Sequence, residues 1–315
     1  MNFWTKLEKP ILSLAPMCGI TDSAFRQICK KHGADVVYSE MASVDALYYK
    51  KSAKKTLDLV KFQKLERPYV VQLFGKDPAK FAKAVEIITQ QVKPDGIDIN
   101  FGCPAKKVFG HGSGASLMND TKKANQIIKS VIQNTTLPVS IKIRSEVKGV
   151  TAVNFLNSID HNQLSALMIH GRTYNQGFFG SIDYTIIKQV KSLLDIPVLA
   201  NGGINTPEEA KLMFDKTNAD GIGLARGVKG KPWLFSQIKD FLVRDKYNEK
   251  NFKQIKKIIL EHAKLSQKEK GEHGIVELRK HLTWYIKGFE GAKELRQELV
   301  RVNSIMDITK ILSMY

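Results

Sequence analysis

Short apolar runs alternate along the first three quarters of the chain with longer stretches whose apolar positions recur every three or four residues. The short runs are typical of buried strands, and the longer stretches are typical of amphipathic helices. Asp22 and Asp77 stand where helix N-caps are expected, and Pro78 suits the first position of a helix. The pattern predicts strands within residues 11–17, 35–40, 69–74, 96–102, 138–144, 164–171, 197–203 and 221–227.

A predicted helix follows each of these eight strands. Short apolar strands that alternate with helices form a parallel sheet covered by helices. Eight such units in about 245 residues match a closed (β/α)8 TIM barrel, whose usual length is about 250 residues. A doubly wound open sheet is the alternative, but it would normally have fewer strands. We therefore predict an α/β protein built on a (β/α)8 barrel.

The alternation stops after Lys246. Helical periodicity then continues through 252–271, 275–289, 291–302 and 305–315, with glycines at several of the breaks. The pattern predicts a barrel domain at residues 1–246 and a small all-helical domain at residues 247–315. We expect the adjacent aromatics Trp284 and Tyr285 to be packing residues, and a nucleic-acid surface is the alternative.

The charge balance points to a polyanionic partner. The chain has 49 Lys and Arg against 31 Asp and Glu, which gives a formal net charge of +18. Basic residues outnumber acidic ones in the predicted helical domain, and a second basic stretch at 48–68 is interleaved with aromatics. Neutralising phosphates releases condensed counterions, so nucleic acid is the expected partner. A general enrichment in lysine is the alternative.

Other features exclude several classes of protein. Three cysteines without paired spacing argue for a reducing cytoplasm and against a disulfide scaffold. No apolar run is long enough to span a membrane, and no signal peptide is visible at the N-terminus. Cysteines and histidines do not show metal-ligand spacing. We expect a cytoplasmic, monomeric protein that binds neither a membrane nor a metal.

Candidate site residues stand where the predicted strands end, because the active site of a (β/α)8 barrel lies at the carboxyl ends of its strands. Barrels of this kind often bind phosphate between the loops that follow strands seven and eight, where glycines let backbone N–H groups approach the anion. Lys142 and His170 end two neighbouring predicted strands, and a shared anionic ligand is the expected reason. The strand-end residues are Pro16, Met17, Cys18, Gln72, Asn100, Cys103, Lys142, Arg144, His170, Arg172, Asn201, Gly202, Gly203, Ala225 and Arg226.

Cys103 is the most distinctive of these residues. It follows a buried strand, precedes Pro104 and opens a long glycine-containing segment that we expect to be a mobile loop. Cys29, by contrast, lies within a predicted helix, where a small buried residue is the default. A thiol at the start of a mobile loop can approach a bound ligand and withdraw from it.

Several motifs together resemble a known family. The segments "PMCGITDSAFR", "NFGCPAKKV", "IKIR", "IHGRT", "NGGI" and "ARG", with "LRKHLTWYIKGF" near the end, are similar to those of the flavin-dependent tRNA-dihydrouridine synthases. The bacterial B-type branch is the most similar, and the resemblance runs from about Ile11 to Ile311. The segment around Cys103 is its most specific part. Dihydroorotate dehydrogenases share only a looser version of that segment.

The resemblance implies a cofactor, a substrate and roles for the residues at the barrel mouth. FMN would be reduced by NADPH or NADH, and the target would be a uridine of tRNA turned out of its stack. Hydride would go to C6 of uracil, and Cys103 would protonate C5 as the general acid. Asn100 and Arg172 would lie near the target, with Arg279 and Lys280 on the RNA-binding face. FMN would contact Pro16, Met17, Cys18, Gln72, Lys142, His170, Asn201, Gly202, Gly203, Ala225 and Arg226.

The chain departs from the usual family pattern at three positions of the predicted cofactor site. Cys18 stands where the family usually has alanine, Gly203 replaces a common acidic residue, and Ala225 replaces a common glycine. Other functions also remain open. They are an enzyme that acts on ribosomal RNA, an FMN oxidoreductase similar to dihydroorotate dehydrogenase, and an RNA-binding flavoprotein without catalytic activity.

Overall fold

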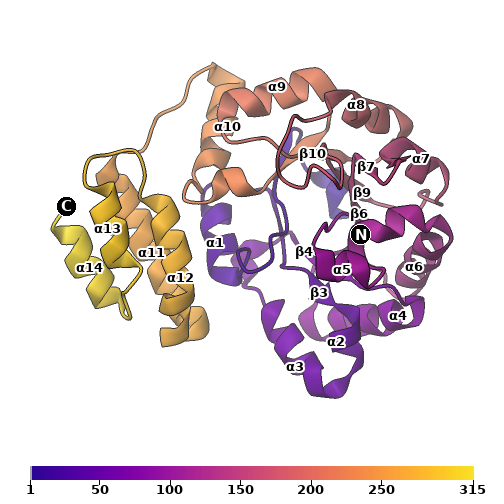
Figure 1. Ribbon diagram of the computed structural model, residues 1–315, viewed down its shortest axis with the longest axis horizontal. Coiled ribbons are helices and arrows are strands. Elements are labelled where there is room, and N and C mark those ends of the chain that lie inside the picture. The colour runs from indigo at the N-terminus through magenta and orange to yellow at the C-terminus, as the bar shows by residue number, and fades with distance from the viewer. Residues whose placement is uncertain (1) are drawn as a thin grey trace.

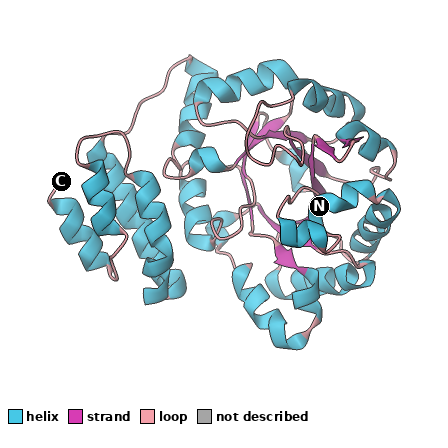
Figure 2. Ribbon diagram, in the orientation of Figure 1, coloured by secondary structure: helices cyan, strands magenta, loops and turns pink. Residues whose placement is uncertain are grey.

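The computed structural model describes residues 2–315, except for the side chains of Lys50 and Lys51. In this range a parallel sheet closes into a barrel, and helices surround it (Figures 1 and 2). Strands follow the order β2-β1-β11-β10-β9-β6-β5-β4, and pairing between β2 and β4 completes the ring. The predicted (β/α)8 barrel is therefore confirmed. Its strands are β1 (Ile11–Leu14), β2 (Val36–Tyr38), β4 (Tyr69–Phe74), β5 (Gly96–Asn100), β6 (Val139–Arg144), β9 (Ala166–His170), β10 (Val198–Asn201) and β11 (Gly221–Leu224).

The second predicted strand is interrupted. After β2 the chain leaves the ladder and then resumes pairing with β4 as β3 (Ala42–Ser43). At the break the Ser39 hydroxyl accepts the backbone N–H of Gln72 at 3.0 Å. A side chain thus satisfies a donor that would otherwise lack a partner in the buried sheet. A further small sheet, β7 (Glu146–Val147) with β8 (Val150–Thr151), lies in the connection after β6.

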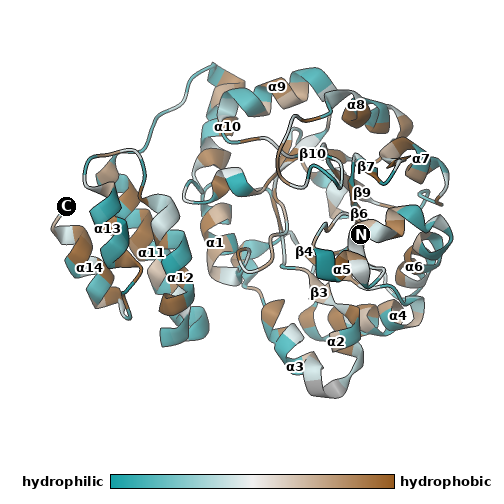
Figure 3. Ribbon diagram, viewed as in Figure 1, coloured by the Kyte–Doolittle hydropathy of each residue, from teal (hydrophilic) through white to brown (hydrophobic). Residues whose placement is uncertain are grey.

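Ten helices of the described chain belong to the barrel. The predicted caps form, since Asp22 accepts the N–H of Phe25 at 3.0 Å and Asp77 accepts that of Ala79 at 2.9 Å. Apolar faces of these helices turn toward the strands and polar faces turn outward (Figure 3). The helices are α1 (Ser23–Lys31), α2 (Val44–Tyr48), α3 (Lys50–Leu59), α4 (Pro78–Ile87), α5 (Lys106–Gly110), α6 (Thr121–Gln133), α7 (Ala152–Asn157), α8 (Tyr184–Leu193), α9 (Pro207–Thr217) and α10 (Leu234–Arg244).

The segment after Cys103 is more regular than the expected mobile loop. It contains α5 and a 3-10 helix, η4 (Gly114–Asn119). Leu117 and Met118 are fully buried against the core, and the backbone N–H of Ala115 donates to the Cys103 carbonyl at 3.2 Å. Apolar residues within a glycine-containing stretch therefore anchor this segment to the barrel, and it forms helical turns where we expected a loop.

Four further helices form a bundle beside α1 (Figure 1). They have their own buried cluster, but Ile28 of α1 and Trp233, which precedes α10, also belong to that cluster. The connection from α10 to the bundle spans residues 245–251, where the predicted boundary falls. The bundle is thus docked on the barrel through shared apolar packing. Its helices are α11 (Phe252–Lys270), α12 (Glu272–Tyr285), α13 (Ala292–Leu299) and α14 (Ile305–Ser313).

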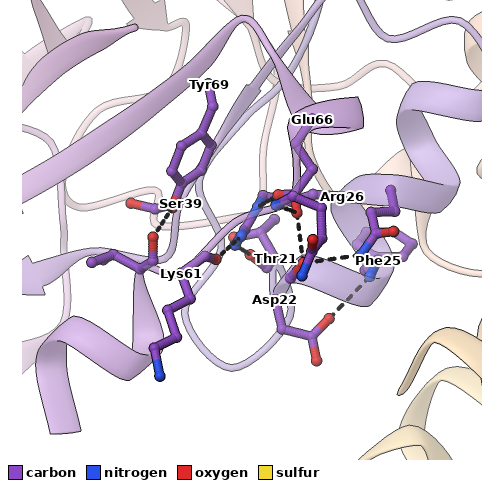
Figure 4. Close-up of polar contacts among 12 residues, drawn as sticks. Thr21, Asp22, Phe25, Arg26, Ser39, Lys61, Glu66 and Tyr69 are labelled. Carbon is purple, nitrogen blue, oxygen red and sulfur yellow. Dashed lines mark hydrogen bonds and ion pairs between the residues drawn. The ribbon is translucent and has the colours of Figure 1, made fainter. Parts of the chain in front are cut away.

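A buried ion pair holds the loop between β1 and α1, which borders the barrel mouth (Figure 4). The Arg26 guanidinium contacts the Glu66 carboxylate at 2.5 Å, and both side chains are fully buried. Arg26 also donates to the carbonyls of Thr21 and Lys61, at 2.6 Å each, while Glu66 accepts from Ser23. Because each group has several partners, the burial of these charges is compensated. The network ties α1 to the segment before β4.

The contact between Gly230 and α12 yields a stability prediction. Gly230 has a φ of +72°, and a Cβ there would lie 2.0 Å from the Trp284 carbonyl oxygen. Gly149 has a φ of +87° but nothing within 4 Å of its Cβ position. We expect Gly230→Ala to lower the free energy of unfolding by about 3–5 kcal/mol, and Gly149→Ala by about 1–2 kcal/mol from backbone strain alone. Urea denaturation measures both, and equal losses would contradict the tight docking contact.

Candidate active site

A cavity of about 960 Å³ opens at the carboxyl ends of the strands. Every site residue predicted within the barrel lines it, from the end of β1 to the loop after β11. Arg279 and Lys280 of α12 do not line it. The predicted residues brought together are Pro16, Met17, Cys18, Gln72, Asn100, Cys103, Lys142, His170, Arg172, Asn201, Gly202, Gly203, Ala225 and Arg226.

The charged side chains that line the cavity are all basic. Among its lining residues, all in the described part of the chain, six are Lys or Arg and none is Asp or Glu. Burial and the surrounding cations, first among them Lys142, lower the pKa of His170 to about 2. His170 is therefore a neutral imidazole near pH 7 and has no acidic proton to give. A cavity of this kind suits an anionic ligand, and the thiols of Cys18 and Cys103 are two proton donors that line it.

The loops after β10 and β11 form an open cradle beside His170. Gly202 has a φ of +112°, and a Cβ there would lie 2.9 Å from the imidazole and 2.9 Å from Ile182. Glycine is thus required both by the backbone conformation and by the space. Arg226, exposed after β11, donates to the Phe178 carbonyl at 2.7 Å and keeps other donors free to bind a ligand.

Lys142 joins the cradle from β6. Its ammonium donates to Asn201 Oδ1 at 3.1 Å, and Asn201 in turn donates to the Gly223 carbonyl at 2.6 Å. Burial and the nearby Arg144 lower the pKa of Lys142 to about 8. Lys142 is therefore mostly charged at neutral pH, but its pKa lies only slightly above that pH.

Two buried polar atoms of residues that line the cavity lack partners within the described chain. They are Nδ1 of His170 and Nη1 of Arg172. Buried polar atoms without partners are rare in native proteins and call for an explanation. A ligand with hydrogen-bonding oxygen or nitrogen atoms at the cavity floor would satisfy them. Together with the glycine cradle and the cations, the free nitrogen of His170 fits a phosphate-bearing polar cofactor such as FMN.

A network of buried hydrogen bonds joins the adjacent strands β6, β5 and β4 and leads to Cys103. Asp98 accepts from Ser140 at 2.6 Å and from the Gln72 amide at 2.7 Å. Gln72 therefore turns its oxygen to Asn100, whose amide donates to it at 2.8 Å. Asn100 Oδ1 then accepts the backbone N–H of Cys103 at 2.8 Å. Each hydrogen bond fixes the amide orientation of the next residue, so this network holds the backbone at Cys103 in place.

Sequence reasoning missed Asp98 and Ser140, the first two members of this network. Both lie inside strands rather than at strand ends, and nothing in the local pattern sets them apart. Burial raises the pKa of Asp98 to about 6, against the lowering effect of its hydrogen bonds from Ser140 and Gln72. Asp98 is therefore mostly a carboxylate near pH 7, able to accept from both partners.

Cys103 itself is half-buried at the edge of the cavity. Burial raises the pKa of its thiol, although the Ala105 N–H and Arg144 act in the opposite direction. Arg144 also donates to the Gly102 carbonyl at 2.8 Å and so holds the residue before the thiol. Cys18 is exposed on the same cavity, and burial together with Glu40 raises its thiol pKa too. Both cysteines thus carry their protons at neutral pH.

Comparison with known proteins assigns the family. A model of the family described as "Dihydrouridine synthase (Dus)" matches residues 13–313. The chain belongs to this family. It is 35% identical over 298 residues to "tRNA-dihydrouridine synthase B" of Pseudomonas aeruginosa, covering 92% of this chain and 88% of the relative. It is 37% identical over 298 residues to the protein of the same name from Pasteurella multocida, covering 93% and 88%.

Solved structures with low sequence identity share the barrel. Histamine dehydrogenase from Rhizobium sp. 4-9 superimposes with a TM-score of 0.57 at 12% identity, covering 81% of this chain and 48% of that one. The structure described as TcOYE with pHBA gives a TM-score of 0.53 at 10% identity, covering 78% and 91%. These similarities show the fold of this dihydrouridine synthase family member and no more.

The helical bundle of this family member carries an exposed basic face. Lys280, Lys287 and Lys293 are exposed, the last two beside a groove that no Asp or Glu lines in the described chain. Arg279 differs, because it donates to the Val302 carbonyl and to the Asn303 side chain within the bundle. Its contacts are structural, which leaves Lys280 as the freer of the two predicted RNA contacts.

No metal cluster and no membrane span are found among the described residues. No three His, Cys, Asp or Glu side chains there come together as metal ligands. No helix in that part of the chain is both long and apolar enough to cross a membrane.

Proposed function

We propose that this chain is an FMN-dependent enzyme that reduces uridine to 5,6-dihydrouridine in tRNA, with NADPH or NADH as the reductant. Family membership and the names of the relatives support the reaction. The observation that carries the proposal is the protonated Cys103 thiol, which lies at the edge of a cationic cavity. No carboxylate is found among the described residues that line this cavity. Reducing a uracil ring needs a proton donor, and this cavity accepts anionic groups.

The residues that would hold FMN are those of the glycine cradle and the adjoining strand ends. Asn201 to Gly203, with Ala225 and Arg226, would bind its phosphate through backbone N–H groups and the guanidinium. Gln72, Lys142 and His170 would offer hydrogen bonds to its ring, and the segment from Pro16 to Cys18 would run beside it. The chemistry that bound FMN supplies is hydride transfer.

Cys103 would deliver the proton that completes the reduction. Its raised thiol pKa keeps the proton in place at neutral pH until the uracil carbon accepts it. The hydrogen bonds that Asn100 and Arg144 make with this segment would hold the thiol in position. Arg172, with its free Nη1, would contact the target nucleotide.

We further propose that residues 247–315 form an RNA-binding domain beside a catalytic barrel of residues 1–246. The exposed lysines of α12 and α13, with Lys54 and Lys55 of α3, would neutralise RNA phosphates. Burial raises the pKa of the Cys18 thiol at the cavity, and the positive charge of the exposed Lys280 on α12 acts in the opposite direction. RNA bound on this face would therefore have a nucleotide within reach of the cavity.

The experiment that tests the function is single-turnover oxidation of the pre-reduced holoenzyme by unmodified tRNA. We expect rapid flavin oxidation, with dihydrouridine appearing in the tRNA. Oxidation by ribosomal RNA alone, or by dihydroorotate-type substrates alone, would favour the corresponding alternative. Flavin that binds but is never oxidised by any RNA would indicate a non-catalytic scaffold.

The lowered pKa of Lys142 predicts a pH dependence of FMN binding. Below about pH 8 the ammonium is present and attracts the anionic cofactor, and above that pH it is lost. We expect the FMN dissociation constant to rise toward tenfold per pH unit above about pH 8. Lys142→Met should bind FMN more weakly and lose this dependence. Fluorescence titration measures both proteins, and a wild-type constant that stays flat from pH 7 to 9.5 would contradict the role of Lys142.

A further inference from the structure

The loop from β9 to α8 forms part of the cavity rim, and side chains from other strands hold its backbone by hydrogen bonds. Three arginines that line the cavity donate to three carbonyls of this loop. Arg144 binds the Gly177 carbonyl at 3.0 Å, Arg226 binds that of Phe178 at 2.7 Å, and Arg172 binds that of Gly180 at 2.8 Å. Charge-assisted hydrogen bonds of this kind are about twice as strong as neutral ones.

Phe179 lies between these anchored residues, and its side chain is 80% exposed. Its own backbone N–H donates to the Gln176 carbonyl at 2.9 Å, so the residue is fixed on both sides. The neighbouring Phe178 is half exposed, but its ring already contacts the Arg226 guanidinium, 4.9 Å from the ring centroid. Phe179 therefore presents a single unpartnered aromatic ring on a backbone that the cavity itself holds in place.

We propose that Phe179 is a stacking platform for a nucleobase of the substrate RNA, next to the nucleotide that enters the cavity. This inference rests on the proposed function. The charge around the ring selects the occupant, because Arg226 and Lys229 line the adjoining rim and no carboxylate does so among the described lining residues. RNA offers phosphates to those cations and a base face to the ring.

The small size of the exposed Phe179 ring favours a nucleobase over a protein as its partner. Isolated aromatic rings bind unpaired bases by stacking, which tolerates any base and is often combined with a positively charged groove. A stable protein interface would need an apolar area far larger than one ring. Phe109 and Tyr174, another pair of aromatic residues, already pack against each other in a tilted arrangement with centroids 4.2 Å apart. Phe179 is thus the ring of this rim that remains available.

The test compares Phe179→Ala and Phe179→Trp with a control, Val243→Ala, whose side chain on α10 is 82% exposed. Each variant is purified with FMN and titrated with unmodified tRNA. We expect Phe179→Ala to weaken tRNA binding about five- to tenfold, with flavin content and reduction by NADPH unchanged. Phe179→Trp should restore the affinity, and Val243→Ala should bind as wild type does.

Fluorescence of the Phe179→Trp variant supplies a direct signature. Stacking on a base should quench the introduced indole when tRNA is added, beyond the change seen in wild type from its three native tryptophans. Unchanged tRNA affinity in Phe179→Ala, or loss of FMN from it, would overturn the platform while leaving the proposed reaction intact. Failure of the wild-type holoenzyme to bind any tRNA would overturn both.

Discussion

Replacing Cys103 with alanine is expected to slow dihydrouridine formation about 10²- to 10⁴-fold, the usual cost of losing a positioned general acid. The expectation follows from the composition of the cavity. Among the described residues that line it there is no carboxylate, and burial together with its cationic neighbours keeps His170 neutral. Cys103 keeps its proton because burial raises its pKa, and its backbone is fixed by Asn100. Without the thiol, the proton donor whose backbone Asn100 holds in place is lost.

The measurement is single-turnover oxidation of pre-reduced Cys103→Ala by unmodified tRNA. The variant should keep FMN, tRNA affinity and reduction by NADPH, because the cradle lies on other strands. Cys18→Ala is the matched control, since it removes the second thiol of the same cavity. It should stay active. Should Cys18→Ala be inactive and Cys103→Ala active, the assignment of the acid would be wrong.

Replacing Asn100 with alanine is expected to reduce the same rate about 100-fold, although Asn100 need not touch the reacting atoms. Its side chain accepts the N–H groups of Gly102 at 3.1 Å and Cys103 at 2.8 Å, and it donates to Gln72. Small misplacements of a reacting group have costs of this order. The variant also leaves the Gln72 amide oxygen without its partner. The thiol should therefore be present but poorly placed.

Asn125→Ala separates positioning from stability. Asn125 on α6 also makes two side-chain hydrogen bonds to neighbouring backbone, to Ser158 and Asp160, but it does not line the cavity. Both variants should lose stability in urea denaturation, whereas only Asn100→Ala should slow proton delivery. A further readout is the rate of Cys103 alkylation, which should change in Asn100→Ala alone. Equal turnover by the two variants would contradict the positioning role.

Local sequence patterns were enough to predict the barrel and its mouth. Apolar periodicity is a property of neighbouring residues, and the carboxyl ends of parallel strands must converge when a sheet closes. Residues as distant as Cys18 and Arg226 could thus be assigned to one cavity before their contacts were known. The basic surplus predicted an exposed cationic face in the same way. The family motifs then added the cofactor and the reaction as expectations.

Side-chain partners depended instead on register and on side-chain direction, which no local pattern encodes. The bonds from Ser140 through Asp98 to Gln72 exist because three adjacent strands place these residues at matching heights. The docking of the helical bundle on Trp233 likewise needs the folded surface of the barrel.

The glycines after Cys103 suggested a mobile loop, but buried Leu117 anchors that segment as helical turns. The exposure of the Phe179 side chain, and the three arginines that hold the neighbouring carbonyls, became visible only in the folded chain. The sequence by itself therefore determined the barrel and the set of residues at its mouth, because both depend on local periodicity and strand direction. Only the tertiary structure decided which of those residues hold one another, because hydrogen bonds and packing join segments that are distant in the chain.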